Sequence, residues 1–510
     1  MTTAKEQTQA QPLAEGTEGP ENLLDSILQK VEVVAPGEKV NVVDFKDPDA
    51  IAERDKGAMM SAALQVFLEA VVKLDKPLES IDKNLIDSLI AAIDSKLSTQ
   101  VDEVLHAEPF QRLESAWRGL KLLVDRTDFR KNVRIDLLNT SKDELRESFE
   151  DAPELIQSAL YKHVYTAGYD QAGADPYGAI VTNYEFENTP QDMALLRDAS
   201  KVAAGAHCPF IASVGHRFFG KDSMGEWKKI PDLRAHMETS DYVKWNAFRD
   251  TEDSRYVGLV FPRYMARLPY GPDTVKAKTF NYEEAVKGYD HDKYLWGNAS
   301  FLFGSNLSRS FSEDGWCVQI RGPQAGGRVS DLPIHAYDVG KGTQLKFPTE
   351  VKISDAEEFD VSDLGFIPAV VYEGKDYAVF FSANSSQKPV KYDDSDATAN
   401  SRINSRLPYI FLASRIAHYL KVQQRENIGS SKPRRQIEEE LQKWLDRLVT
   451  KMDNPSDRVI AKHPLKAAQV KVLDVEGNPG FYQVRTMIQP HFQVEGLDIS
   501  LSLVGKLPTQ

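Results

Sequence analysis

The alternation of hydrophobic and polar positions divides the chain into a polar opening tail and two long blocks of helices and strands. Residues 1–22 are dominated by Gln, Thr, Glu, Gly and Pro, a composition typical of a disordered segment. Directly after this tail, apolar side chains recur at helical spacing. The residues of this apolar face are Leu23, Leu24, Ile27 and Leu28. An apolar helix on a soluble tether has two readings: it packs on the parent domain, or another protein recognises it.

The next apolar run, residues 38–46, has the pattern of a short strand between Pro36 and Pro48. Its apolar residues are Val40, Val42, Val43 and Phe45. No second strand pattern lies close to it in the sequence, and the backbone groups of a strand need a partner at a sheet edge. We therefore predict that this segment is an inter-subunit strand, paired with a sheet on another protomer.

Helical spacing then predicts helices over 57–74, 83–106 and 109–125. The first is apolar nearly all round and is expected to be buried, whereas the other two have one apolar face each. The third begins with Pro109 in its first turn, where proline is favoured. The apolar positions of the last two helices are Leu85, Ile86, Leu89, Ile90, Ile93, Leu97, Val101, Val104, Phe110, Leu113, Trp117, Leu120 and Val124.

After these helices the apolar period changes to two. The stretch "NVRIDLL" (132–138) alternates apolar and charged residues and predicts a half-exposed strand. Further apolar runs predict buried strands over 178–186, 209–214 and 256–262. Helix signals lie between them: Ser141 and Glu144 have the spacing of a capping box, and Thr189 precedes Pro190. Strands that alternate with helices indicate an α/β domain.

A polar stretch, 382–404, separates this block from a second one. The second block begins with a predicted helix over 407–427, closed by Gly429, and continues with a helix after Pro433. It ends in predicted strands over 467–477, 480–494 and 496–505. In the last strand the apolar residues Leu497, Ile499, Leu501 and Leu503 alternate with polar ones, which predicts a strand with one buried face.

Composition excludes several classes of protein. With 510 residues the chain is too long for one hydrophobic core. Its formal net charge of -14 argues against binding nucleic acid, which requires a basic face. The two cysteines, Cys208 and Cys317, are far apart, as in proteins of a reducing compartment. The N-terminus has no apolar signal core, and no run of about 18 apolar residues exists. We therefore expect a cytoplasmic protein without direct membrane insertion.

Local motifs give no support for an enzyme. No phosphate-binding loop, nucleophile elbow or zinc-protease signature is present. His207 beside Cys208 is read as structural, and residues 393–400 as a solvated loop rather than a calcium site. The Gly-rich stretch 321–328 has two readings: an anion held by backbone amides, or, as we favour, a flexible connection. We predict no catalytic residues, no metal and no cofactor, although an enzyme whose site assembles from distant residues stays open.

Taken together, several stretches resemble one family. They are "FQRLESAWRGL" (110–120), "HCPFIAS" (207–213), "FPRYMARLPYG" (261–271), "WGNASFLFGSNLSRSF" (296–311), "GWCVQIRG" (315–322), "LPYIFLASRIAHYLKV" (407–422) and "HFQVEGLDISLSLVGKLP" (491–508). In this order they are similar to the large sheath subunit of the bacterial type VI secretion system, the TssC or VipB family. The resemblance runs from about residue 21 to residue 508.

The resemblance implies a mixed α/β (α+β), multi-domain fold of the contractile tail-sheath kind, with a disordered N-terminal tail and β-strand exchange between subunits. The domains we expect are a tail at 1–22, a recognition helix and exchanged strand at 23–50, a central α/β sheath domain at 55–381, and a C-terminal α/β sheath domain at 405–510 that packs with the small subunit.

The resemblance also implies partners. The large subunit of the family pairs with a small subunit (TssB or VipA), polymerises with further copies around an inner tube on a baseplate, and contracts to propel effectors out of the cell. The AAA+ ATPase ClpV recycles contracted sheaths and recognises an N-terminal helix, a role that the resemblance assigns to Leu23, Leu24, Ile27 and Leu28. The alternatives are a single-component phage-tail-like sheath protein and a soluble enzyme without local motifs.

Overall fold

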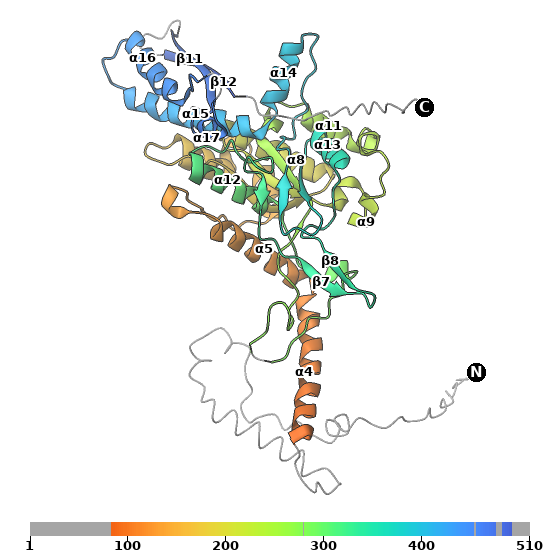
Figure 1. Ribbon diagram of the computed structural model, residues 1–510. Coiled ribbons are helices and arrows are strands. Elements are labelled where there is room, and N and C mark those ends of the chain that lie inside the picture. The colour runs from red at the N-terminus through yellow and green to blue at the C-terminus, as the bar shows by residue number, and fades with distance from the viewer. Residues whose placement is uncertain (1–82, 279, 453–454, 476–481, 492–510) are drawn as a thin grey trace, which may run out of the picture. The chain divides into compact units, whose positions relative to one another are not determined.

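The computed structural model describes residues 83–278, 280–452, 455–475 and 482–491, and the chain divides into two compact units (Figure 1). Several predicted segments lie outside the described residues and stay predictions: the apolar helix at 23–28, the strand at 40–45, the helix at 57–74 and the last strand at 497–503.

One unit comprises residues up to Glu103 together with Tyr270–Glu284. Its described part contains most of helix α4 (Lys83–Leu105), which confirms the helix predicted from residue 83. The Tyr282 hydroxyl donates a hydrogen bond of 2.6 Å to Asp102 Oδ1 and so joins the loop to the helix. Ile90 and Ile93 are about half exposed, so the apolar face of α4 is not covered along its length.

The other unit, Val104–Pro269 with Ala285–Gln510, is built on a six-stranded sheet of order β1-β2-β3-β9-β10-β6. The first four strands run parallel and the last two run antiparallel to their neighbours. The strands are β1 (Ile180–Phe186), β2 (Phe210–Val214), β3 (Val257–Phe261), β9 (Ile367–Val371), β10 (Ala378–Phe380) and β6 (Arg328–Val329). Every residue of β2, β3 and β9 is buried, which explains their continuous apolar sequences.

Helices cover both faces of this sheet (Figure 1). On one face, α8 (Pro190–Ala206) and α11 (Val243–Arg249) pack against alternate strand residues such as Phe210 and Leu259. On the other face, α12 (Ser300–Asp314) packs against Ile211 and Val260. Two neighbouring strand residues, such as Phe210 and Ile211, therefore belong to different cores.

Helix starts follow the capping residues that the sequence contains. The Thr189 side chain accepts the backbone N–H of Asp192 at the start of α8. Ser141 and Glu144 form the predicted capping box of α6. Further α-helices of this part are α5 (Glu108–Asp125), α6 (Lys142–Glu150), α7 (Ala159–Tyr161), α9 (Met224–Trp227), α10 (Leu233–Met237), α13 (Asp355–Asp363) and α14 (Ser395–Asn404). A π-helix spans Lys162–Asp170. Two short antiparallel pairs join β4 (Tyr264–Met265) to β5 (Trp296–Gly297) and β7 (His335–Asp338) to β8 (Thr343–Lys346).

The second predicted block has its own apolar core. Helix α16 packs its buried residues Ile437, Leu441 and Leu445 against the antiparallel pair β11–β12. Its elements are α15 (Leu407–Asn427), α16 (Arg434–Leu445), α17 (Asp457–Lys462), β11 (Leu465–Asp474) and β12 (Tyr482–Pro490). The predicted helices and the first two predicted strands of this block are confirmed. Helix α15 contributes residues to this core and to the core beneath the sheet.

Three local predictions are wrong. Residues 132–138 form no strand, because no described segment pairs with them. The stretch 393–400 is the start of a helix rather than a loop, since Asp394 caps α14. The Gly-rich segment 321–328 is not a loose connection: the N–H groups of Gly322 and Gly327 donate to Phe380 O and Gly322 O at 2.7 and 2.8 Å. Those amides are therefore not open to an anion either.

Candidate subunit-interaction surface

The described residues contain no group of three His, Cys, Asp or Glu side chains arranged to hold a metal ion. His207 ends α8 in a left-handed conformation and its Nδ1 lies 3.1 Å from the Tyr256 hydroxyl. Burial raises the pKa of the neighbouring Cys208 thiol well above its ordinary value. The pair therefore has a structural role, as the sequence predicted.

The buried carboxylate of Glu350 is paired with positive charge. Glu350 accepts hydrogen bonds from Arg263 at 2.6 and 2.9 Å, and His291 lies 3.0 Å from the same carboxylate. Burial alone would raise the pKa of Glu350, but the Arg263 charge and these hydrogen bonds outweigh it and lower the pKa to about 2. A carboxylate held ionised in this way is a poor proton donor or acceptor near neutral pH.

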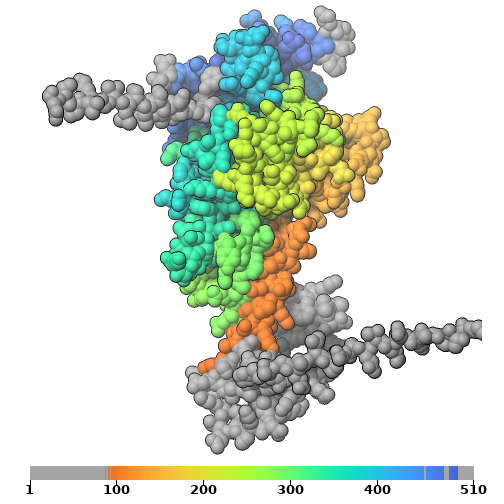
Figure 2. All heavy atoms as spheres, turned by 90° about the vertical axis from the view of Figure 1, so that its right-hand side faces the viewer, coloured from red at the N-terminus to blue at the C-terminus, as the bar shows by residue number. Residues whose placement is uncertain are grey.

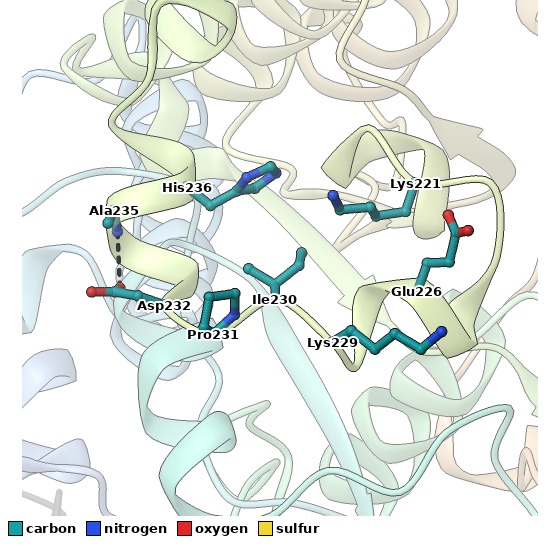
Figure 3. A pocket seen from close by; sticks show the side chains of 8 residues that line it. All are labelled: Lys221, Glu226, Lys229, Ile230, Pro231, Asp232, Ala235 and His236. Atoms are coloured by element: carbon teal, nitrogen blue, oxygen red, sulfur yellow. Dashed lines mark hydrogen bonds between the residues drawn. The ribbon is translucent and has the colours of Figure 1, made fainter.

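A hollow of about 580 Å³ lies beside α9 and α10 (Figure 3). Two of its polar side chains are engaged with the protein itself. Asp232 accepts the Ala235 N–H at 2.9 Å, and His236 Nε2 lies 3.0 Å from Phe219 O and 3.1 Å from the Tyr242 hydroxyl. These contacts fix the short helix α10.

Around this hollow, distant parts of the chain are joined by ion pairs. Figure 2 shows the segment around α9 and α10 next to the segment that contains α13. Arg234 Nε lies 2.9 Å from Asp360 Oδ1, and Lys228 Nζ lies 2.6 Å from Glu357 Oε1. These charge pairs are exposed, and each contributes about 1 kcal/mol or less.

Helix α5 carries several exposed apolar side chains. Leu113, Trp117 and Val124 are 56%, 64% and 37% exposed, although their spacing gives one continuous face. The opposite face of α5 carries small residues: a Cβ at Gly119 would overlap the ring of Phe301 on α12. Because α12 needs this close approach, the bulky apolar side of α5 points outward.

Polar contacts fix the orientation of α5. Glu114 accepts from Arg118 at 2.7 Å and from Arg267 at 2.8 Å, and the Arg267 side chain is only 6% exposed. The Ser115 hydroxyl donates to Trp296 O at 2.8 Å. The exposed apolar face is therefore held in place.

The sequence matches two domain families in succession. Residues 87–387 match the EvpB/VC_A0108 tail sheath N-terminal domain, and residues 396–507 match the tail sheath gpW/gp25-like domain of the same family. The first match alone covers more than half of the chain. The chain belongs to the EvpB/VC_A0108 tail sheath family.

A relative of this sheath family, the type VI secretion system sheath protein TssC1 of Pseudomonas aeruginosa, is 42% identical over 435 residues, which is 83% of this chain and 86% of the relative. Solved structures resemble the chain much more loosely. A chain of the anti-feeding prophage baseplate is 11% identical, covers 73% of this chain and 83% of its own length, and has a TM-score of 0.37. A chain of the anti-feeding prophage helical sheath in its contracted state is 10% identical. The match covers 62% of this chain and 68% of that chain, with a TM-score of 0.31.

The tail sheath family is consistent with a site made of surfaces rather than of a catalytic pocket. The residues predicted from the sequence to bind partners lie outside the described ranges, so their positions stay predictions. The structure adds the exposed face of α5, which was not predicted, and shows that residues 132–138, predicted as a half-exposed strand, have no strand partner among the described residues. Gly119 is the sequence signal for the orientation of α5, because a glycine in mid-helix often marks a close approach to another helix. Within the described ranges no helix is long and apolar enough to cross a membrane.

Proposed function

We propose that this chain is the large subunit of a type VI secretion system contractile sheath. It pairs with a small sheath subunit, polymerises as a helical tube around an inner tube on a baseplate, and contracts to propel effectors out of the cell. The observation that carries the proposal is the 42% identity to a TssC1 sheath protein over 83% of the chain. The proposal includes a cytoplasmic location and a purely structural, non-enzymatic role.

Assembly by this protein requires contacts strong enough to overcome charge repulsion between copies. Each chain carries a formal net charge of -14, so long-range electrostatics opposes the packing of identical chains. The outward face of α5, with Leu113 and Trp117, offers the apolar area that repeated contacts need. The second component of the proposal is the exchange of strands between subunits. It involves the segment with Val40, Val42, Val43 and Phe45, and the last strand with Leu497, Ile499, Leu501 and Leu503.

Recycling completes the proposal. The helix with Leu23, Leu24, Ile27 and Leu28 is the recognition element for the ClpV ATPase, displayed on the polar tail 1–22. The four aliphatic side chains provide about 6–12 kcal/mol of gross burial energy. Association and ordering costs remove much of this, so a reversible affinity is expected.

The test is expression of the full chain with and without the small sheath subunit, followed by electron microscopy. We expect tubes only when both proteins are present. Tubes formed by the chain alone would favour a single-component sheath, and a soluble monomer that never polymerises in the presence of the small subunit would contradict the proposal.

A further inference from the structure

Strand β11 has one edge that faces away from β12, and side chains of α16 occupy this edge. Helix α16 lies against the hairpin of β11 and β12 (Figure 1). Gln442 Oε1 accepts the Val470 N–H at 2.8 Å, and Gln442 Nε2 donates to Ala468 O at 3.0 Å. Glu438 Oε2 accepts the Val472 N–H at 2.8 Å. Strand backbone groups are therefore bonded to a helix instead of to a neighbouring strand.

These backbone groups are the ones that an added strand would use. In an antiparallel pair the residues of one strand direct their N–H and C=O groups alternately toward the partner strand and away from it. Ala468, Val470 and Val472 are alternate residues of β11. Since the N–H groups of Val470 and Val472 bond to α16, this set of residues faces away from β12, on the side where a further strand would lie.

The fit between helix and strand follows from their repeats. Glu438 and Gln442 are four residues apart and so advance about 6 Å along α16, while alternate strand residues advance about 6.8 Å along β11. One side chain per helical turn therefore meets one outward N–H per strand repeat. The same row of α16 continues at Arg434, which forms an ion pair with Asp474 at 3.5 Å.

The Gln442 side chain supplies the same groups as a peptide unit. A carboxamide has a C=O acceptor and N–H donors, as the backbone of a neighbouring strand has. Its Nε2 also donates to Asp446 Oδ1 at 2.8 Å, which holds the amide in this orientation. Nearer the start of β11, the Thr450 N–H donates to Leu465 O at 3.1 Å. Bonds to this edge are thus distributed from Leu465 to Val472.

We propose that Glu438 and Gln442 block the β11 edge against strands of other chains. Unpaired strand edges are the places where proteins add strands from one another, and native proteins cover them. Here the cover consists of hydrogen bonds that an incoming strand would have to displace. The apolar residues that hold α16 on the sheet are different ones: Ile437, Leu441 and Leu445. The edge can therefore be opened without removing an apolar core contact.

Hydrogen–deuterium exchange and sedimentation velocity of the full chain test the proposal. The double variant Glu438→Ala with Gln442→Ala keeps strong helix formers and removes both acceptors without adding a large apolar side chain. We expect the amides of Val470 and Val472 to exchange about tenfold faster than in wild type. We also expect the double variant to associate with itself at a concentration about tenfold lower.

Two control variants separate the edge from other effects. Glu439→Ala with Gln436→Ala removes the same two residue types from α16, but their printed partners, Arg435 and Glu440, lie in the same helix. Glu438→Gln keeps a side-chain oxygen that accepts the Val472 N–H. Both controls should exchange and associate as wild type does. Association through any other surface is common to all these proteins and cancels in the comparison.

Two results would contradict the proposal. Unchanged exchange at Val470 and Val472 in the double variant would show that α16 does not protect these amides. Faster exchange without stronger association would show that the contacts do not keep other chains away. If the double variant loses its thermal transition, Glu438→Ala alone, which frees only the Val472 N–H, is compared with Glu438→Gln by the same two measurements. Since the chain is studied alone, none of these results bears on the sheath function.

Discussion

At the scale of single residues, buried groups whose protonation changes between pH 4 and 7 decide the response to acid. His418 is 2% exposed, and its Nε2 lies 2.9 Å from Ala206 O. Burial lowers the pKa of His418 to about 4, and the nearby positive charges of Arg415 and Lys421 act in the same direction. The unfolded chain binds a proton near pH 6.5, so folding excludes a proton that the unfolded state would take up.

We therefore predict that stability falls as the pH decreases from about 6.5 towards 4, by up to about 3 kcal/mol for this group. The full contribution is present above pH 6.5. His418→Gln, which retains an N–H donor, should flatten that part of the profile. The measurement is the thermal midpoint at a series of pH values for both proteins, and parallel profiles would contradict the assignment.

A glycine controls the contact of α5 with α12. Gly119→Ala places a methyl group against the ring of Phe301, which is itself buried, and we expect a loss of about 1–3 kcal/mol. Gly178→Ala is the matched control, because a Cβ at Gly178 meets no atom within 4 Å. Thermal unfolding of both variants checks the prediction. Equal midpoints would show that α12 can shift to accept the methyl group without a loss of stability.

At the scale of elements, α5 has two apolar faces with different roles. Trp117→Ser should change stability by about 0.5 kcal/mol or less, since the side chain is 64% exposed, and should lower the yield of tubes. Leu123→Ser on the opposite, buried face should cost about 2–5 kcal/mol. Denaturation midpoints and tube yield, measured together, separate the two faces. A large loss of stability from Trp117→Ser would place that face in the core instead.

The N-terminal helix is the element on which recycling is proposed to depend. Leu24→Ser with Ile27→Ser removes most of its apolar face and leaves its charge unchanged. We expect such sheaths to assemble and contract once but to persist as contracted tubes. Anisotropy titration of a labelled peptide of residues 20–34 against the N-terminal domain of the ATPase should show binding at least about tenfold weaker for the double variant than for wild type.

Gln29→Ser, on the polar side of the same helix, is the control for that titration. Equal binding of the wild-type and double-variant peptides would show that the ATPase does not recognise the apolar face of the helix, which would then pack on the parent domain.

The elements that the sequence predicted well are those with local signals. The strands β2 and β3 are continuous apolar runs, and α8 begins at a Thr–Pro pair. All three elements could therefore be assigned from the sequence alone. The segment 132–138 could not, because periodicity reports an extended chain and carries no information on a partner. The apolar spacing of α5 does not by itself show which face is exposed, since a buried stripe and an exposed stripe have the same spacing. What a surface binds depends on which other chains are present.

At the scale of the whole unit, α15 joins the core beneath the sheet to the core of the second block. Arg425 near its end donates to Gln171 O, Asp170 O and Tyr169 O at 2.9, 3.0 and 3.3 Å, and Lys421 Nζ lies 3.6 Å from the centre of the Tyr169 ring. These contacts attach the last turns of α15 to the π-helix Lys162–Asp170.

We predict that Arg425→Ala loosens the second block without unfolding the sheet, because three backbone carbonyls lose their donor. Limited proteolysis of the full chain should then cut faster after residue 427, while fragments containing the sheet persist. Arg435→Ala is a suitable control, since its pair with Glu439 is exposed and lies within one helix. Identical digestion patterns for the two variants would contradict this role for Arg425.

The length of α15 has a mechanical consequence. A helix of 21 residues is a rod about 32 Å long, and the first half of this rod is packed, with Leu407 in the core beneath the sheet and Leu412 and Ile416 in the core of the second block. A force applied to the second block therefore reaches the sheet through this packed half of α15. Because bending it would disrupt packed side chains of both cores, we expect the sheet and the second block to turn as one piece when a force acts on either.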